Sequence, residues 1–110
     1  MRLPNAERAV VEIAKLRDYS LSPRHPDGKH KARVFAAALG LSQADAGWLR
    51  EQLVRVAHEA DCQPSHRTAH GQRYLIDFDV TIRGRTARLR SAWIVRRGED
   101  FPRMTTCYVL

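Results

Sequence analysis

The sequence contains only two cysteines and no long apolar run, and both features limit the classes of protein to which the chain can belong. Cys62 and Cys107 lie far apart, without the dense spacing of a disulfide-stabilised secreted domain, and no apolar signal segment follows Met1. No stretch approaches the roughly 18 apolar residues that cross a bilayer. We therefore expect a cytoplasmic protein with reduced thiols and no contact with a membrane.

The familiar catalytic motifs are also missing. The chain has no Gly-x-Gly-x-x-Gly pattern, no Walker-type lysine loop, no Gly-x-Ser-x-Gly elbow and no His-Glu-x-x-His helix. No pair of carboxylates stands out either, because the acidic residues fall on predicted helix surfaces, on one hairpin face and in turns. Nucleotide-dependent enzymes, elbow hydrolases and zincins are therefore excluded.

What the chain does have is positive charge. It carries 19 Lys and Arg against 12 Asp and Glu, a net charge of +7, which favours a polyanionic partner such as RNA or an acidic protein. The alternative is that this charge serves only solubility. A length of 110 residues, 44% of them hydrophobic, suits one compact domain spanning residues 1–110.

Apolar residues at helical spacing predict two or three helices in the first half of the chain. We expect one over the second half of Leu3–Tyr19, one from about Lys29 to Leu39, and one from Ser42 to about Ala60. Gly40 is a C-cap candidate, and Ser42 with Asp45 is close to a capping box. Ser20–Gly28, with two prolines and a glycine, is expected to be a loop.

After residue 72 the apolar period changes to two, which predicts strands over residues 74–82 and 87–95. If Arg83-Gly84 is a two-residue turn, Ile82 pairs with Arg85. The same register makes three further pairs, which match charge with charge and apolar with apolar: Asp79 with Arg88, Asp77 with Arg90, and Phe78 with Leu89.

Two weaker strand predictions complete the second half of the chain. Residues 61–72 are expected to form a loop or an irregular edge strand. Arg103–Leu110 is expected to be a last strand in which Met104, Thr106 and Tyr108 share one face. The predicted class is α+β, with two or three N-terminal helices packed on a C-terminal antiparallel sheet of three to four strands.

The segment Leu21–Phe35 gathers cations and turn-forming residues at the expected entrance of the second helix. Its prolines fix the backbone and Gly28 supplies a turn. The cations that follow are then displayed around the free N–H groups of the helix: Lys29, His30, Lys31 and Arg33. Donors and positive charge converge there, as a phosphate group requires.

The same segment carries a family resemblance. Together with residues 38–41, it resembles the His-Pro-x-Gly-x-x-Lys-Ala-x-x-Phe signature of an uncharacterised family of small bacterial domains. A second block is similar over Arg90–Val95, Gly98–Arg103 and Thr106–Val109, so that the resemblance covers nearly the whole chain. Members of that family look like stand-alone proteins with a small neighbouring partner, or like C-terminal modules of polymorphic, filamentous-haemagglutinin-type toxins.

The resemblance implies an RNase-like toxin component held in check by a small antitoxin or immunity-like protein, since such modules are often RNases. The expected helices and sheet are also similar to the barnase/EndoU/RelE-like ribonucleases, an analogy of fold. Their chemistry needs a base for the 2′-hydroxyl, cations for the phosphorane and an acid for the leaving oxygen, and it needs no metal or other cofactor.

Eight residues are candidates for these roles. The candidate catalytic residues are His25, His30, Lys31 and Tyr108, which supply imidazole, ammonium and hydroxyl groups. The candidate phosphate or RNA contacts are Lys29, Arg33, Arg90 and Thr106.

Each functional assignment has a structural alternative. His25 can serve only to brace its loop, and Lys31 can lay its stem on the core while its ammonium reaches solvent. Cross-strand pairing already gives Arg90 an aspartate partner. Tyr74 and Trp93 are most simply core aromatics rather than platforms for base stacking.

A metal site is a further candidate, formed by Cys62, His66, His70 and Cys107. Pro64 prevents a regular helix from aligning the first three, and no Cys-x-x-Cys pair anchors the ion, so zinc is disfavoured. The histidines are expected to form a solvated basic loop with Arg67 and Arg73.

Two functional hypotheses follow from the sequence. The first is metal-independent cleavage of RNA by a toxin component. The alternative is a non-enzymatic basic module that binds nucleic acid or an acidic partner protein, for which RNA would remain intact and binding would weaken steeply with salt.

Overall fold

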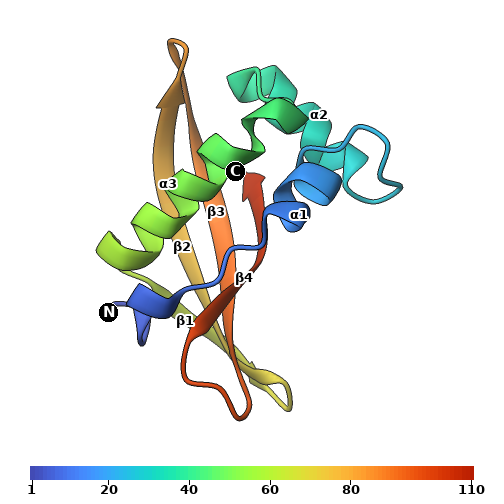
Figure 1. The fold of residues 1–110 in the computed structure, drawn as a ribbon. Coiled ribbons are helices and arrows are strands. Elements are labelled where there is room, and N and C mark those ends of the chain that lie inside the picture. Colours follow the sequence, from blue (N-terminus) through green and yellow to red (C-terminus); the bar gives the residue numbers. More distant parts are fainter.

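The computed structural model describes all 110 residues and has helices on one face of a four-stranded antiparallel sheet. The helical elements come first: η1 (Ala6–Arg8), α1 (Ile13–Lys15), η2 (Leu16–Ser20), α2 (Lys29–Leu39), η3 (Gln43–Asp45) and α3 (Ala46–Glu59). The strands follow in sheet order: β1 (Gln63–Thr68), β2 (Gly71–Ile82), β3 (Arg85–Arg96) and β4 (Pro102–Val109). Figure 1 shows α3 lying across the sheet. The predicted α+β class is confirmed.

The helix boundaries follow local capping signals. Gly40 adopts a left-handed conformation, with φ 68°, and its N–H donates back to α2, which therefore ends at Leu39. Ser42 and Asp45 form the expected capping box at the start of η3, and α3 continues from it to Glu59. None of the helices combines the length and the apolar character that crossing a membrane requires.

The first predicted helix is broken into smaller pieces. Only Ile13–Lys15 is α-helical, and η2 continues it as a π-helical turn. The Leu21 N–H donates to the Leu16 carbonyl at 2.8 Å, and the Ser20 hydroxyl donates to the Lys15 carbonyl at 3.2 Å. The backbone bond from Leu21 to Leu16 spans five residues, which is the spacing of a widened π turn.

The β2–β3 hairpin has the predicted register. Ile82 pairs with Arg85, and the three further pairs occur as expected: Asp79 with Arg88, Asp77 with Arg90, and Phe78 with Leu89. Arg83 and Gly84 both have positive φ values, 49° and 79°, as a two-residue type I′ turn requires.

The predicted alternation along β4 is wrong at one residue. The register with β3 shifts between Ala92, which pairs with Thr106, and Trp93, which pairs with Met104. Thr105 is the extra residue of this bulge, and its hydroxyl donates to the Ala92 carbonyl at 3.2 Å. The bulge changes the face of every later side chain in β4. Tyr108 therefore lies beside Arg90 on the outer face of the sheet rather than on the face of Met104.

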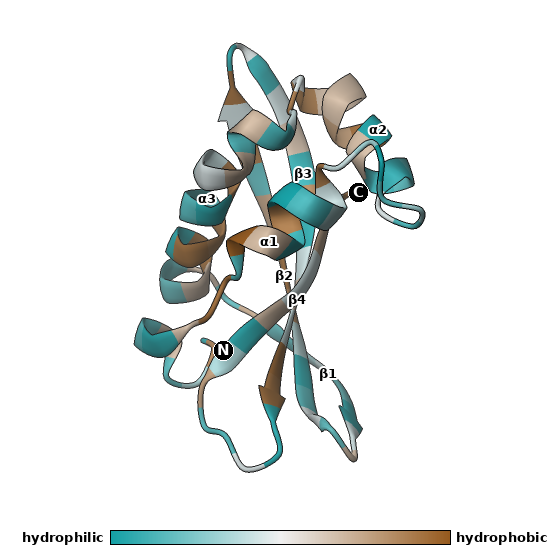
Figure 2. Ribbon diagram, turned by 45° about the vertical axis from the view of Figure 1, so that its right-hand side comes forward, coloured by the Kyte–Doolittle hydropathy of each residue, from teal (hydrophilic) through white to brown (hydrophobic).

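The core lies between the inner face of the sheet and the helices, with Trp93, Phe35 and Leu53 fully buried. Figure 2 shows α3 alternating hydrophobic and hydrophilic residues along its turns, as expected for a helix with one buried face. The buried hydroxyl of Ser91 provides hydrogen-bond partners for two polar groups in the core. Ser91 Oγ accepts from the Trp93 indole at 2.9 Å and donates to the Ile76 carbonyl at 3.0 Å.

The two edges of the sheet differ. Strand β1 is short, exposed and irregular, with a register shift between Pro64 and Arg67, so the prediction of an irregular edge strand is confirmed. At the other edge, Val10 forms a parallel bridge to Arg103, and Lys15 Nζ donates to the Met104 carbonyl at 3.3 Å. The N-terminal segment thus covers the first half of β4 and leaves its last residues next to α2.

Candidate functional site

The loop between η2 and α2 is held by two side chains that accept backbone hydrogen bonds. Ser22 Oγ accepts from the N–H groups of Arg24 and His25, both at 3.3 Å. His25 Nδ1 accepts from the N–H groups of Asp27 and Gly28, both at 3.0 Å. The Lys29 N–H donates to the His25 carbonyl. The expectation of free donors at this helix entrance is therefore wrong for residues 27–29, because the loop itself uses them.

Gly28 lies in the predicted turn, and it has a second purpose there. Its φ is −70°, which any residue adopts, but a Cβ at this position would lie 2.1 Å from the carbonyl oxygen of Tyr19. Only a residue without a side chain allows the start of α2 to approach η2 so closely. This approach brings Tyr19 to the side of Lys31.

Tyr19 is the centre of a small cluster. Lys31 Nζ donates to the Tyr19 hydroxyl at 2.9 Å and lies 4.8 Å from the centre of its ring. The His25 ring meets the Tyr19 ring edge to face, with 4.7 Å between their centres. Lys31 is half-buried, so its ammonium is held in place rather than free in solvent.

Three of the four candidate catalytic residues line one groove of about 440 Å³ between α2 and the end of β4. Its lining consists of His30, Lys31, Val34, Tyr108 and Val109. His30 and Val34 are exposed, whereas the other three are half-buried. The structure thus brings an imidazole, an ammonium and a phenol together from two segments that are far apart in the sequence. His25 does not line the groove, and its ring instead contacts Tyr19.

Arg90 lies next to this groove but is paired. Its guanidinium donates to both carboxylate oxygens of Asp77, at 2.8 and 2.9 Å. The Asp77 carboxylate, and after it the Tyr108 hydroxyl, raises the pKa of Arg90 above its ordinary value. In return, the hydrogen bonds from Arg90 lower the pKa of Asp77. Arg90 therefore stays charged beside Tyr108, and part of its donor capacity is already used.

The Asp77–Arg90 pair makes stability depend on pH. Because the pKa of Asp77 is lowered in the folded chain, its stabilising effect is complete above the ordinary value of 3.8 and is lost as the pH falls through the lowered pKa. We expect Asp77→Asn to decrease the free energy of unfolding at neutral pH and to flatten its decline in acid. Urea unfolding across an acidic pH series measures both effects.

Asp79→Asn is the matched control for this variant, since Asp79 pairs with Arg88 on the same face but is 65% exposed. We expect a smaller change for it. Equal acid profiles for wild type and Asp77→Asn would contradict the assignment.

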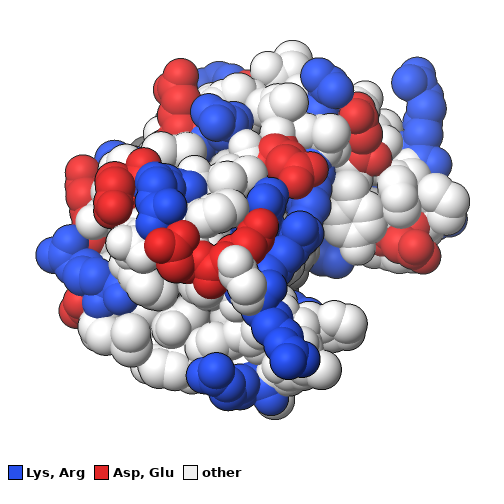
Figure 3. Space-filling view, turned by 60° about the horizontal axis from the view of Figure 1, so that its bottom comes forward, with Lys and Arg blue, Asp and Glu red and all other residues white.

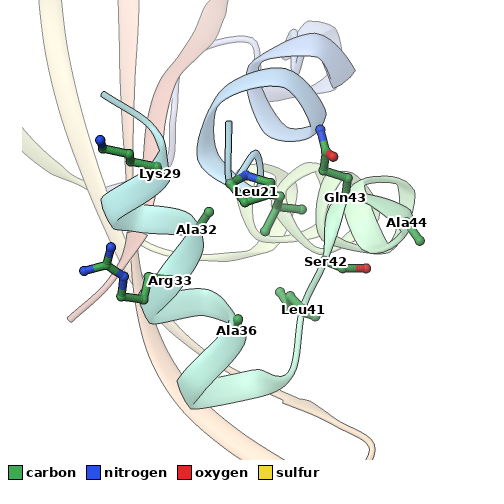
Figure 4. Close-up of a pocket in the computed structure, with 10 residues that line it drawn as sticks. Leu21, Lys29, Ala32, Arg33, Ala36, Leu41, Ser42, Gln43 and Ala44 are labelled. Atoms are coloured by element: carbon green, nitrogen blue, oxygen red, sulfur yellow. The ribbon is translucent and has the colours of Figure 1, made fainter. Parts of the chain in front are cut away.

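Lys29 and Arg33 lie at a second concavity, of about 540 Å³, on another flank of α2. Its lining is mostly apolar or small: Leu21, Pro23, Ala32, Ala36, Leu41, Ser42, Gln43 and Ala44. Figure 4 shows the charged ends of Lys29 and Arg33 extending away from Leu21 and Leu41. These two cations are therefore at the margin of a different hollow from Lys31, and the structure does not bring them to the groove.

Thr106 does not reach the groove either. Its hydroxyl oxygen is buried and has no hydrogen-bond partner, although we expected it to contact phosphate. The four residues of the zinc candidate are also apart, and no three metal-ligating side chains cluster anywhere in the structure. Cys107 is fully buried, and burial raises the pKa of its thiol to about 12, whereas His66 and His70 are exposed.

Sequence reasoning did not identify Tyr19 as part of the site. Tyr19 stands at helical spacing from Val10, Ile13 and Leu16, which is the pattern of a core position, and the widened turn in η2 changes where its side chain lies. Its position directly before the cationic loop was the one available signal.

Comparison with known proteins places the chain in a family without assigning it an activity. No curated protein and no solved structure matches it. The model of a family described as a domain of unknown function, DUF6883, matches residues 2–110. The chain therefore belongs to the DUF6883 family.

Proposed function

We propose that this chain is an RNase-like toxin component that cleaves RNA phosphodiester bonds without a metal ion in the groove between α2 and β4. The observation that carries the proposal is the convergence of His30, Lys31 and Tyr108 on one groove, with the Arg90 guanidinium beside Tyr108. The resemblance to toxin-associated bacterial domains, and the fold-level analogy with barnase/EndoU/RelE-like ribonucleases, supply the substrate class.

The proposed step transfers two protons and uses no cofactor. The 2′-oxygen attacks the phosphorus as the bond to the 5′-oxygen breaks, which yields a 2′,3′-cyclic phosphate and a 5′-hydroxyl. His30 accepts the proton of the 2′-hydroxyl, and Tyr108 donates a proton to the leaving 5′-oxygen. Lys31, with Arg90 nearby, stabilises the charge that develops on the non-bridging oxygens.

His30 is a better proton acceptor than His25 in this arrangement. The N–H groups of Asp27 and Gly28 both donate to the Nδ1 atom of His25. That nitrogen therefore has no free lone pair to accept a proton from a substrate. His30 is exposed at the groove. We therefore assign His25 to positioning the loop and Tyr19, and His30 to proton transfer.

The proposal includes a small acidic antitoxin or immunity-like protein that covers the groove in the cytoplasm. Helix α2 contains four basic residues and no carboxylate, which suits an acidic partner. Val34, on the groove wall, is 45% exposed and offers an apolar contact beside these charges.

Incubation of the purified protein with RNA in excess EDTA tests the proposal. We expect fragments that end in a 2′,3′-cyclic phosphate, and we expect His30→Ala to slow their formation by about 100-fold, as for loss of a general base. His58→Ala, an exposed histidine near the end of α3, is the control and should leave the rate unchanged. Intact RNA with the wild-type protein, or equal rates for wild type and His30→Ala, would reject this mechanism.

A further inference from the structure

The end of the sheet remote from the β2–β3 turn carries a second group of cations, which we call the arginine end. It comprises Arg67, Arg73, Arg96 and Arg97, from β1, β2, β3 and the residue after β3. None of these four side chains makes an ion pair, although most of the other arginines do. The exposed imidazoles of His66 and His70 lie on the same turn and strand.

The four arginines surround two neighbouring hollows. Arg67, Arg96 and Arg97 line one of about 550 Å³, together with Tyr74. Arg73, Arg96, Arg97 and His70 line the other, of about 520 Å³. Since Arg96 and Arg97 belong to both, the hollows adjoin at the end of the sheet, and they lie on opposite faces of it because Arg73 and Tyr74 are consecutive residues of β2. Figure 3 looks towards this end and shows Lys and Arg side chains in the lower part of the view without acidic atoms beside them.

The backbone holds these cations together. The Arg97 N–H donates to the His70 carbonyl at 2.9 Å and ties the end of β3 to the β1–β2 turn. Gly71, with φ 144°, permits this contact, because a Cβ there would lie 2.1 Å from the carbonyl oxygen of Val95. Backbone contacts, rather than ion pairs with carboxylates, thus keep the guanidinium groups close together against their mutual repulsion.

Glu99 is the only carboxylate that lines either hollow. Both of its oxygens accept from Arg103, each at 2.9 Å, so it is already neutralised by a fifth arginine. The positive charge of the arginine end is therefore uncompensated within the chain, and it is arranged over concave surfaces on which an anion has several donors at once.

We propose that the arginine end binds the phosphodiester backbone of a nucleic acid strand. Guanidinium groups match phosphate oxygens in pairs, and Arg96 and Arg97, which line both hollows, suit neighbouring phosphates of a strand that passes around the end of the sheet. An acidic protein is the less suitable occupant, because the buried centre of a protein interface is more apolar than its rim. The large exposed apolar residues of this chain are Met1, Val34 and Leu110, and none lines these hollows. The binding site is separate from the cleavage groove and does not rest on the cleavage chemistry.

Fluorescence anisotropy of labelled strands of about 16 nucleotides, long enough for one site, tests this proposal. The probes are DNA and 2′-O-methylated RNA, which transesterification cannot cleave, and polyglutamate is the acidic-protein probe. We expect Arg96→Gln with Arg97→Gln to weaken strand binding at least tenfold, and to lower the slope of log affinity against log salt by about 1.4. Arg55→Gln with Arg85→Gln removes the same charge from exposed residues elsewhere and should have a much smaller effect.

The outcomes separate the explanations. Equal loss in both double variants would show that net charge alone attracts the strand, and would overturn the proposal. Unchanged affinity, or tighter binding of polyglutamate than of either strand, would also overturn it. Similar affinities for the two strands would support recognition of the shared backbone, and a preference for one would support the proposal and identify that strand as the ligand. Because neither strand is cut, failure of the proposed cleavage leaves this measurement valid.

Discussion

Replacing Lys31 with alanine is expected to slow RNA cleavage by about 100-fold or more, which is the usual cost of removing one group that stabilises transition-state charge. Lys31 is the one ammonium that the structure places in the groove with His30 and Tyr108. The Tyr19 hydroxyl holds its Nζ at 2.9 Å, so the charge is positioned before a substrate binds. The rate of cyclic-phosphate formation measures the loss.

Lys29→Ala is the matched control, because Lys29 is on the same helix and has the same charge but lies at the other concavity. It should change the rate severalfold at most. Tyr19→Phe removes the hydroxyl that positions Lys31 and keeps the charge, so we expect a smaller loss than for Lys31→Ala. Equal rates for Lys29→Ala and Lys31→Ala would mean that general charge, and not this ammonium, supports cleavage. Thermal unfolding of each variant verifies that the fold is retained.

Replacing Gly28 with alanine is expected to destabilise the fold by roughly 1–3 kcal/mol or more, as for an overpacked core position. The added Cβ would lie 2.1 Å from the Tyr19 carbonyl oxygen, and both atoms belong to the backbone or are fixed to it, so neither can rotate away. Either α2 or η2 must move. That movement separates Tyr19 from Lys31, and cleavage should fall together with the free energy of unfolding measured in urea.

Gly47→Ala makes the same chemical change as Gly28→Ala and is expected to have the opposite effect on stability. Gly47 is exposed within α3, and a Cβ there meets nothing within 4 Å. Alanine favours a helix interior over glycine by about 1 kcal/mol, so this variant should be more stable than wild type. A Gly28→Ala protein as stable as wild type would show that α2 and η2 are not in close contact.

The sequence predicted those parts of the fold that depend on neighbouring residues. The β2–β3 register followed from the alternation of side chains, since a slip of one residue would bury Arg88 and Arg90. Gly40 predicted where α2 ends, and the Ser42–Asp45 capping box predicted where the next helical segment begins. The hydrogen bonds at both boundaries span only a few residues.

Two features of the candidate site were not predictable in this way. The bulge at Thr105 changes the face of Tyr108, and periodicity could not show it because the extra residue leaves the polar and apolar pattern of β4 plausible. The division of the α2 cations between two concavities was also not predictable. Lys29 and Arg33 line one concavity with Leu21 and residues of η3, whereas Lys31 lines the groove with the end of β4.

By itself, the sequence determined the class of the domain, its strand register, its helix ends and its excess of positive charge, because these depend on local pattern and composition. Only the tertiary structure decided which cations share a surface. It grouped Lys31 with Tyr108 and His30, assigned His25 to its own loop, and brought four unpaired arginines to one end of the sheet. The physical reason is that charge is counted along the chain, whereas an anion responds to donors that are close together in space.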